Sequence, residues 1–262
     1  MRLGHINFLN VLPLTYGYDH VGIVPTVGVP TKINRLLDEG ALDVSQISSI
    51  EFARMSDRLV MLPDICVRAD ADVQSIVLVS KKPIERLDGA RVILTSKSVT
   101  AQCLLKIILS KSYDVRPIYE TRAVSTDNPI DDDASAALLI GDDALYIYHH
   151  RPADYYCYDV GREWHRLTGR SMVYAVWAAR KDFDGIDEAR ATIERAMKYG
   201  LEHKSEAIRA ELSSRPFTFE QLDKYLGGVI RWDLTAEHVA SLKLYYRLAH
   251  ELGLIDRAPQ SF

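Results

Sequence analysis

The chain has 262 residues, 47% hydrophobic and 26% charged, which is typical of a globular protein with room for two lobes. Asp and Glu number 36 against 32 Lys and Arg, and the net charge of -4 argues against nucleic-acid or membrane-surface binding, because both favour basic patches. Cys66, Cys103 and Cys157 form no CxxC pair, and no secretion signal opens the chain. No apolar run is long enough to span a bilayer. We therefore expect a cytoplasmic protein without a disulfide framework.

Short apolar segments alternate with amphipathic ones, which predicts an α/β fold. Strands are expected at residues 3–8, 21–27, 44–47, 75–80, 91–95, 115–119, 136–140 and 172–178. Between two of them, Ile33, Leu36 and Leu37 share one helical face, and Gly40 suits the end of that helix. The segment that starts at Ser98 repeats apolar residues with helical spacing, and Ser98 is a good N-cap. After residue 184 the pattern is nearly all helical.

Two stretches rich in Pro and Gly resemble linkers, at residues 80–90 and 179–187. If the chain crosses between lobes at both, residues 82–175 form one lobe. Residues 1–81 and 176–262 then form the other lobe together. The sequence contains no GxGxxG, GxxxxGK[ST], GxSxG or HExxH motif, and no metal-ligand cluster of suitable spacing.

Polar residues follow several predicted strands, where open α/β sheets bind ligands. Ser48 and Ser49 occupy one such turn, Ser98 and Thr100 a second, and Gly141 with Asp142 a third. Each hydroxyl taken alone is explained by helix capping. Several such turns in one chain favour a small anion held by helix N-termini.

Several segments resemble a known family: "GHINFLNVLPLTYG", "ISSIEFAR", "PDICV", "VQSIVLVSKKPIERLDGARVILTSKSVT", "AALLIGDDAL" and "GREWHRLTGRSMVYAVWAAR". They are similar to the chorismate dehydratases of the futalosine route to menaquinone, in collinear order over most of residues 3–180. The resemblance implies a type II periplasmic-binding-protein fold, with two α/β lobes and a cleft between them. It also implies conversion of chorismate to 3-[(1-carboxyvinyl)oxy]benzoate with loss of water.

By the family's pattern Asn10 and Ser75 are active-site residues, and Ser98, Val99 and Thr100 form a substrate-binding turn. Without the resemblance, Asn10 would be a turn residue ahead of Pro13 and Ser75 a strand hydroxyl bonded to backbone. The reaction needs no metal or organic cofactor. The expected partner is chorismate alone, with no nucleic acid or membrane, and the chain is expected to be a monomer or homodimer.

Two other functions remain open, and the sequence argues against a third. The first is 1,4-dihydroxy-6-naphthoate synthase, an enzyme of the same pathway and fold, although "FLNVLP" and "TGRSMVYAVWA" favour the dehydratase. The second is a solute-binding protein for a small anion, against which the lack of an export signal argues. The third is a transcription regulator, for which no residues are left to build a helix-turn-helix domain.

A general base for removing the chorismate C3 proton is not evident among Asn10, Ser75, Ser98 and Thr100, because none is basic at neutral pH. His5 is near in sequence but lies mid-strand, and a carboxylate at Asp142 would repel a dianion. We therefore hypothesise that the carboxylate on the enolpyruvyl side arm of the substrate takes this proton.

Overall fold

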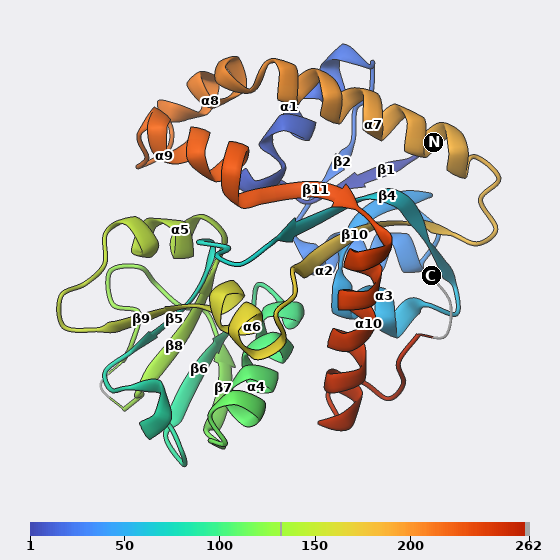
Figure 1. Cartoon of the computed structure of the whole chain (residues 1–262). Helices are drawn as coiled ribbons and strands as arrows, with labels where there is room; N and C mark the ends of the chain where they lie inside the picture. The colour runs from blue at the N-terminus through green and yellow to red at the C-terminus, as the bar shows by residue number, and fades with distance from the viewer. Residues whose placement is uncertain (132, 260–262) are drawn as a thin grey trace.

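The computed structural model describes residues 1–131 and 133–259 of the chain. Residue 132 of the second expected lobe and residues 260–262 of the first lie outside the described residues. Two separate sheets organise the molecule, with helices packed around each of them (Figure 1).

The first sheet has six strands in the order β11-β4-β10-β3-β1-β2. Its strands are β1 (Leu3–His5), β2 (Thr26–Val27), β3 (Val44–Ser48), β4 (Leu59–Ala69), β10 (Met172–Arg180) and β11 (Ile230–Leu234). Strand β1 pairs in parallel with β2 and β3, whereas β10 and β11 run antiparallel to their neighbours. Both ends of the chain therefore contribute to this sheet.

Helices from both ends of the chain accompany the first sheet (Figure 1). They are η1 (Leu9–Val11), α1 (Leu12–His20), α2 (Pro30–Asp38), α3 (Ser49–Met55), α7 (Ile186–Glu202), α8 (Lys204–Leu212), α9 (Phe219–Lys224), the π-helical η3 (Tyr225–Val229) and α10 (Ala236–Glu251). Helices α1 and α7 touch through two glycines. A Cβ on Gly17 would overlap the carbonyl of Ala196, and one on Gly200 would overlap the carbonyl of Pro13. This close contact holds α1, which starts two residues after Asn10.

The second sheet has five strands in the order β7-β6-β8-β5-β9. These strands are β5 (Ile76–Ser80), β6 (Arg91–Thr95), β7 (Ile118–Arg122), β8 (Ala136–Ile140) and β9 (Tyr156–Asp159). The accompanying helices are η2 (Ile84–Arg86), α4 (Val99–Ser112), α5 (Gly141–His149) and α6 (Val160–Thr168). Strands β5 and β8 are buried along their whole length, because helices and neighbouring strands cover them.

The expected lobe boundaries at residues 82 and 175 do not match the sheets. Strand β5, which precedes residue 82, pairs with β8 and β9 of the second sheet. Strand β10 starts at Met172 and pairs with β3 and β4 of the first sheet. The Pro- and Gly-rich stretches are local turns, between β5 and β6 and between β10 and α7. The crossings lie earlier, between β4 and β5 and between α6 and β10.

Several strands also differ from the prediction. Strand β1 ends at His5, β2 covers only Thr26–Val27, and β7 lies three residues further along than expected. Strands β4, β9 and β11 were not expected at all. In β4 the strand pattern is interrupted by Pro63 and by Asp64, whose φ of 66° is left-handed. Strand β11 lies in the region read as helical.

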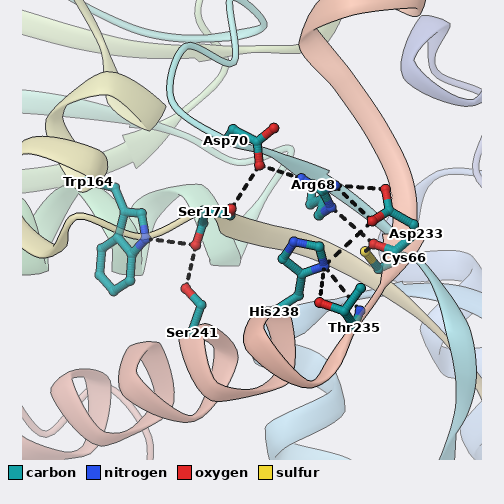
Figure 2. A network of polar contacts seen from close by, with 9 residues as sticks. All are labelled: Cys66, Arg68, Asp70, Trp164, Ser171, Asp233, Thr235, His238 and Ser241. Atoms are coloured by element: carbon teal, nitrogen blue, oxygen red, sulfur yellow. Dashed lines mark hydrogen bonds and ion pairs between the residues drawn. The ribbon is translucent and has the colours of Figure 1, made fainter.

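A polar network holds the crossing at the end of β4 (Figure 2). The buried guanidinium of Arg68 donates from Nη2 to both carboxylate oxygens of Asp233, at 2.7 and 2.8 Å. Its Nη1 also pairs with Asp70, the first residue after β4. Strand β11 and the outgoing crossing are thereby joined through one side chain.

The returning crossing belongs to the same network. The hydroxyl of Ser171, just before β10, donates to Asp70 Oδ1 at 2.9 Å. The Ser171 carbonyl accepts from Trp164 Nε1 of α6 at 3.2 Å and from the Ser241 hydroxyl of α10 (Figure 2). The two crossings are therefore tied to each other and to a helix on each side.

Candidate active site

A cavity of about 520 Å³ lies between the two sheets. Strands β3, β4 and β10 of the first sheet and β5 and β8 of the second all contribute residues to its wall. Of the residues predicted for a site, the cavity brings together Asn10, Ser48, Ser75, Ser98, Val99 and Gly141. Residues from distant parts of the sequence thus converge on a volume that suits a small metabolite.

Three helices begin at this cavity. Ser48 is the N-cap of α3, and its hydroxyl makes no capping bond. Ser98 caps α4, with its Oγ accepting from Ala101 N at 3.2 Å. Helix α5 begins at Gly141, whose φ of +66° is left-handed and favours glycine. Because helix N-termini carry unbonded N–H groups and a positive dipole end, the cavity is suited to an anion.

Asn10 lies in the short helix η1 and lines the cavity. Its carbonyl oxygen accepts a hydrogen bond from Trp232 Nε1 at 2.9 Å. Its side-chain Oδ1 is buried and has no hydrogen-bond partner among the described residues. The backbone of Asn10 is therefore held in place, while the oxygen of its side-chain amide makes no hydrogen bond within the described residues.

Ser75 is only 5% exposed and lies at the entry to β5. Its hydroxyl donates to the Val73 carbonyl at 3.3 Å and accepts from the Tyr225 hydroxyl at 2.8 Å. Its carbonyl accepts from Gly141 N at 2.8 Å. These contacts place the serine beside the start of α5, at the entry to the second sheet, whereas Asn10 precedes helix α1 of the first.

Three predicted site residues do not line the cavity. Ser49 is fully buried and donates to the Val173 carbonyl at 2.7 Å. The Thr100 hydroxyl accepts from Ile50 N at 3.0 Å and so joins α4 to α3. The carboxylate of Asp142 pairs with Arg215. Burial raises the pKa of Asp142, and the charge of Arg215 offsets part of this rise. All three side chains therefore bond to other protein groups around the cavity.

Among the cavity residues that the sequence did not predict, two are polar and lie inside the protein. Gln46 of β3 and Tyr174 of β10 are both buried and both line the cavity. Gln46 Oε1 and the Tyr174 hydroxyl have no hydrogen-bond partner among the described residues. Burying a polar group without a partner is unfavourable, so these atoms are natural ligand contacts. A glutamine inside the apolar strand "VSQIS" was the signal available for one of them.

The charged side chains at the cavity are already paired. Glu51 pairs with Arg54 at 2.7 Å, Asp38 pairs with Arg58, and Lys97 pairs with Asp143 at 2.6 Å. Such pairs leave neutral donors and helix termini as the groups at hand for a bound anion.

His5 does not line the cavity. It is buried behind η1, with its ring bonded to Thr15 Oγ1 at 2.8 Å and to the Tyr18 hydroxyl at 3.4 Å. Burial lowers the pKa of His5 to about 4. The imidazole is therefore part of the buried core around the first sheet and not part of the site.

Within residues 1–131 and 133–259, no group of three or more His, Cys, Asp and Glu side chains is placed to hold a metal ion. In the same described part of the chain, no helix combines the length and apolar character needed to cross a membrane.

A family model described as menaquinone biosynthesis matches residues 1–251. A chorismate dehydratase of Thermus thermophilus is 30% identical over 223 residues, which cover 80% of this chain and 80% of that protein. The residues matched by the family model include every residue that lines the cavity.

Solved structures share the fold. A protein of Archaeoglobus fulgidus has a TM-score of 0.75 at 20% identity and covers 97% of this chain and 98% of its own. The periplasmic aliphatic sulphonate binding protein SsuA of Escherichia coli has a TM-score of 0.66 at 14% identity and covers 98% and 94%. The predicted periplasmic-binding-protein-like fold is confirmed.

Proposed function

Because the chain belongs to the menaquinone-biosynthesis family that its residues 1–251 match, we propose that it is a chorismate dehydratase. It removes water from chorismate and forms 3-[(1-carboxyvinyl)oxy]benzoate for the futalosine pathway. The observation that carries this proposal is the cavity itself, where Asn10 and Ser75 lie among three helix N-termini. That combination suits a dianion whose reaction moves negative charge.

Chorismate carries two carboxylates and a hydroxyl at C4. The starts of α4 and α5 offer backbone N–H groups to the carboxylates, and the Ser48 hydroxyl is uncommitted as a cap. Val99 contributes to the wall beside Ser98. Ser49, Thr100 and Asp142 support the site by holding the helix starts and do not touch substrate. Gln46 and Tyr174 supply polar contacts from the first sheet.

The reaction breaks the C3–H and C4–O bonds. Electrons from the C3–H bond move into the ring and towards its conjugated carboxylate, and hydroxide then leaves C4 as the ring becomes aromatic. The Asn10 amide and the Ser75 hydroxyl donate hydrogen bonds to the charge that develops on the ring carboxylate or on the departing oxygen. The hydroxide takes up the abstracted proton and is released as water.

The side-arm carboxylate of chorismate is the proposed base. His5 lies outside the cavity, and Asp142 is paired with Arg215, so neither sequence candidate faces the substrate. The side arm is attached at C3, next to the proton that must leave. Intramolecular groups held in this way reach effective molarities of about 10⁵–10⁸ M. The protein's part is to keep the arm folded over the ring.

Incubation of the protein with chorismate tests the proposed activity. We expect an aromatic product lighter than chorismate by one water, detected by mass spectrometry and absorbance. Chorismate that binds without change would identify a solute-binding protein instead. Turnover only of a later pathway intermediate would indicate the 1,4-dihydroxy-6-naphthoate synthase.

A chorismate analogue with an amide in place of the side-arm carboxylate tests the proposed base. We expect this analogue to bind and to remain intact, because the amide cannot accept the C3 proton. Dehydration of the analogue at the normal rate would disprove the role of the side arm. Loss of turnover in His5→Gln or Asp142→Asn, with substrate still bound, would assign the base to the protein.

The setting of the enzyme is also proposed. All three cysteines are free thiols, which suits the reducing cytoplasm. We expect the chain to act as a monomer or a homodimer. The reaction described needs neither a metal nor an organic cofactor.

A further inference from the structure

The segment from Tyr225 to Trp232 contacts both proposed catalytic residues. Trp232 Nε1 donates to the Asn10 carbonyl at 2.9 Å, and the Tyr225 hydroxyl donates to Ser75 Oγ at 2.8 Å. This segment comprises the π-helical η3 and the start of β11, where the sequence predicted only helix. π-helical turns are rare and occur often at functional sites. The two contacts come from opposite ends of the segment.

Tyr225 does not line the cavity, so it cannot act on substrate directly. Its side chain is buried at 1% exposure, and its hydroxyl donates to Ser75. Burial raises the pKa of Tyr225, which keeps the phenol protonated. A protonated phenol beside Ser75 Oγ remains a hydrogen-bond donor to it at neutral pH.

This donor determines what the Ser75 hydroxyl can do. Because its oxygen accepts from Tyr225, Ser75 must direct its own proton elsewhere. In the protein alone that proton goes to the Val73 carbonyl over a long 3.3 Å contact. A substrate oxygen in the cavity would offer a better acceptor, and a hydroxyl that accepts one hydrogen bond becomes a stronger donor.

We infer that Tyr225 is a positioning residue, which orients the Ser75 hydroxyl so that its proton points at the reacting substrate. This inference rests on the proposed catalytic role of Ser75. Tyr225 acts only through that serine and makes no contribution to substrate binding. Trp232 performs a parallel task for the backbone of Asn10, although a backbone contact cannot direct the amide itself.

Tyr225→Phe removes the hydroxyl and keeps the ring. We expect kcat for chorismate to fall about tenfold with KM unchanged, as for the loss of one hydrogen bond that strengthens in the transition state. The matched control is Tyr18→Phe, since Tyr18 is also buried and its hydroxyl bonds to His5 Nδ1, outside the cavity, at 3.4 Å. The control should keep normal kcat. Rates are normalised to folded protein measured by circular dichroism.

A double-mutant cycle separates this inference from the proposed function. Ser75→Ala should remove most turnover, and adding Tyr225→Phe to it should cause no further loss, because Tyr225 acts through Ser75. Normal turnover in Ser75→Ala would overturn the proposed role of Ser75 and this inference with it. Loss in Ser75→Ala with normal kcat in Tyr225→Phe would overturn this inference alone. An undiminished tenfold effect of Tyr225→Phe in the Ser75→Ala background, or a change in KM alone, would also overturn it.

Discussion

The carboxylate of Asp159 anchors the crossing that leads into Ser75. Asp159 Oδ1 accepts from Val73 N and Arg162 N, both at 3.0 Å, and Oδ2 accepts from Gln74 N at 2.7 Å. Gln74 has a left-handed φ of 60°, an uncommon conformation for a residue with a side chain. The next residue is Ser75, so this carboxylate sets the direction in which the serine enters β5.

Asp159→Ala leaves the buried N–H groups of Val73 and Gln74 without acceptors. Each unpaired buried N–H costs about 1–3 kcal/mol, so the two together lower the free energy of unfolding by about 4 kcal/mol. At about 2–4 °C per kcal/mol for a chain of this size, Tm should fall by roughly 8–16 °C. We also expect chorismate turnover to fall in the protein that remains folded, because Ser75 is no longer held.

Two variants make the comparison sharp. Asp159→Asn keeps Oδ1 for Val73 and Arg162 but turns an NH₂ towards the N–H of Gln74, so its Tm should lie between wild type and Asp159→Ala. Asp72→Asn weakens a half-exposed pair with Arg162 and should lower stability by about 1 kcal/mol or less. Scanning calorimetry measures all three. A Tm for Asp159→Ala within about 2 °C of wild type would refute this account of the crossing.

Three further predictions concern the site and its support. Asn10→Ala should lower turnover by ~10²–10³, the usual cost of losing a donor to developing charge. Denaturant titration should show unchanged stability, because the buried Oδ1 has no hydrogen-bond partner in the described part of the chain. Gly141→Ala should lower the free energy of unfolding by about 1–2 kcal/mol, since φ is +66° there; an unchanged urea midpoint would contradict this. Burial raises the pKa of Asp233, but the hydrogen bond and charge of Arg68 outweigh it, so the pKa is lowered. The pair therefore stabilises the fold above pH ~4, and this stabilisation is lost as the pH falls through the lowered pKa. Arg68→Met should therefore destabilise the protein more at pH 7 than at pH 3, and an equal loss at both would be inconsistent with the pair.

The fold class could be predicted from the sequence because several strands of the two sheets, among them β5, β6, β8 and β10, are apolar runs that alternate with amphipathic segments. The boundaries could not, because the first crossing, at residues 70–75, contains neither Pro nor Gly, and the second contains only Gly169, which reads as the end of helix α6. Strand β4 passes Pro63 and a left-handed Asp64 before it ends, and Gln74 takes a left-handed conformation that glycine more often adopts. Tertiary contacts such as the Asp159 carboxylate hold these conformations, and no local pattern reveals them.

Local pattern and resemblance each indicated part of the cavity wall, and the resemblance alone indicated Asn10 and Ser75. Turns after strands indicated Ser48, Ser98 and Gly141, and all three line the cavity. The same turns suggested Thr100, which follows the cavity residue Val99, yet the Thr100 hydroxyl accepts a hydrogen bond from Ile50 N and does not line the cavity. Tyr225 is 150 residues from Ser75 in the sequence, so no spacing rule could connect them.

The most direct test of the central claim is a crystal structure of Ser75→Ala soaked with chorismate. We expect intact chorismate between the two sheets, with a carboxylate at the start of α4 or α5 and the Asn10 amide within hydrogen-bonding distance of the ring carboxylate or the C4 oxygen. The side-arm carboxylate should lie over C3. Chorismate bound outside this cavity, or with C3 and C4 facing away from residues 10 and 75, would contradict the account.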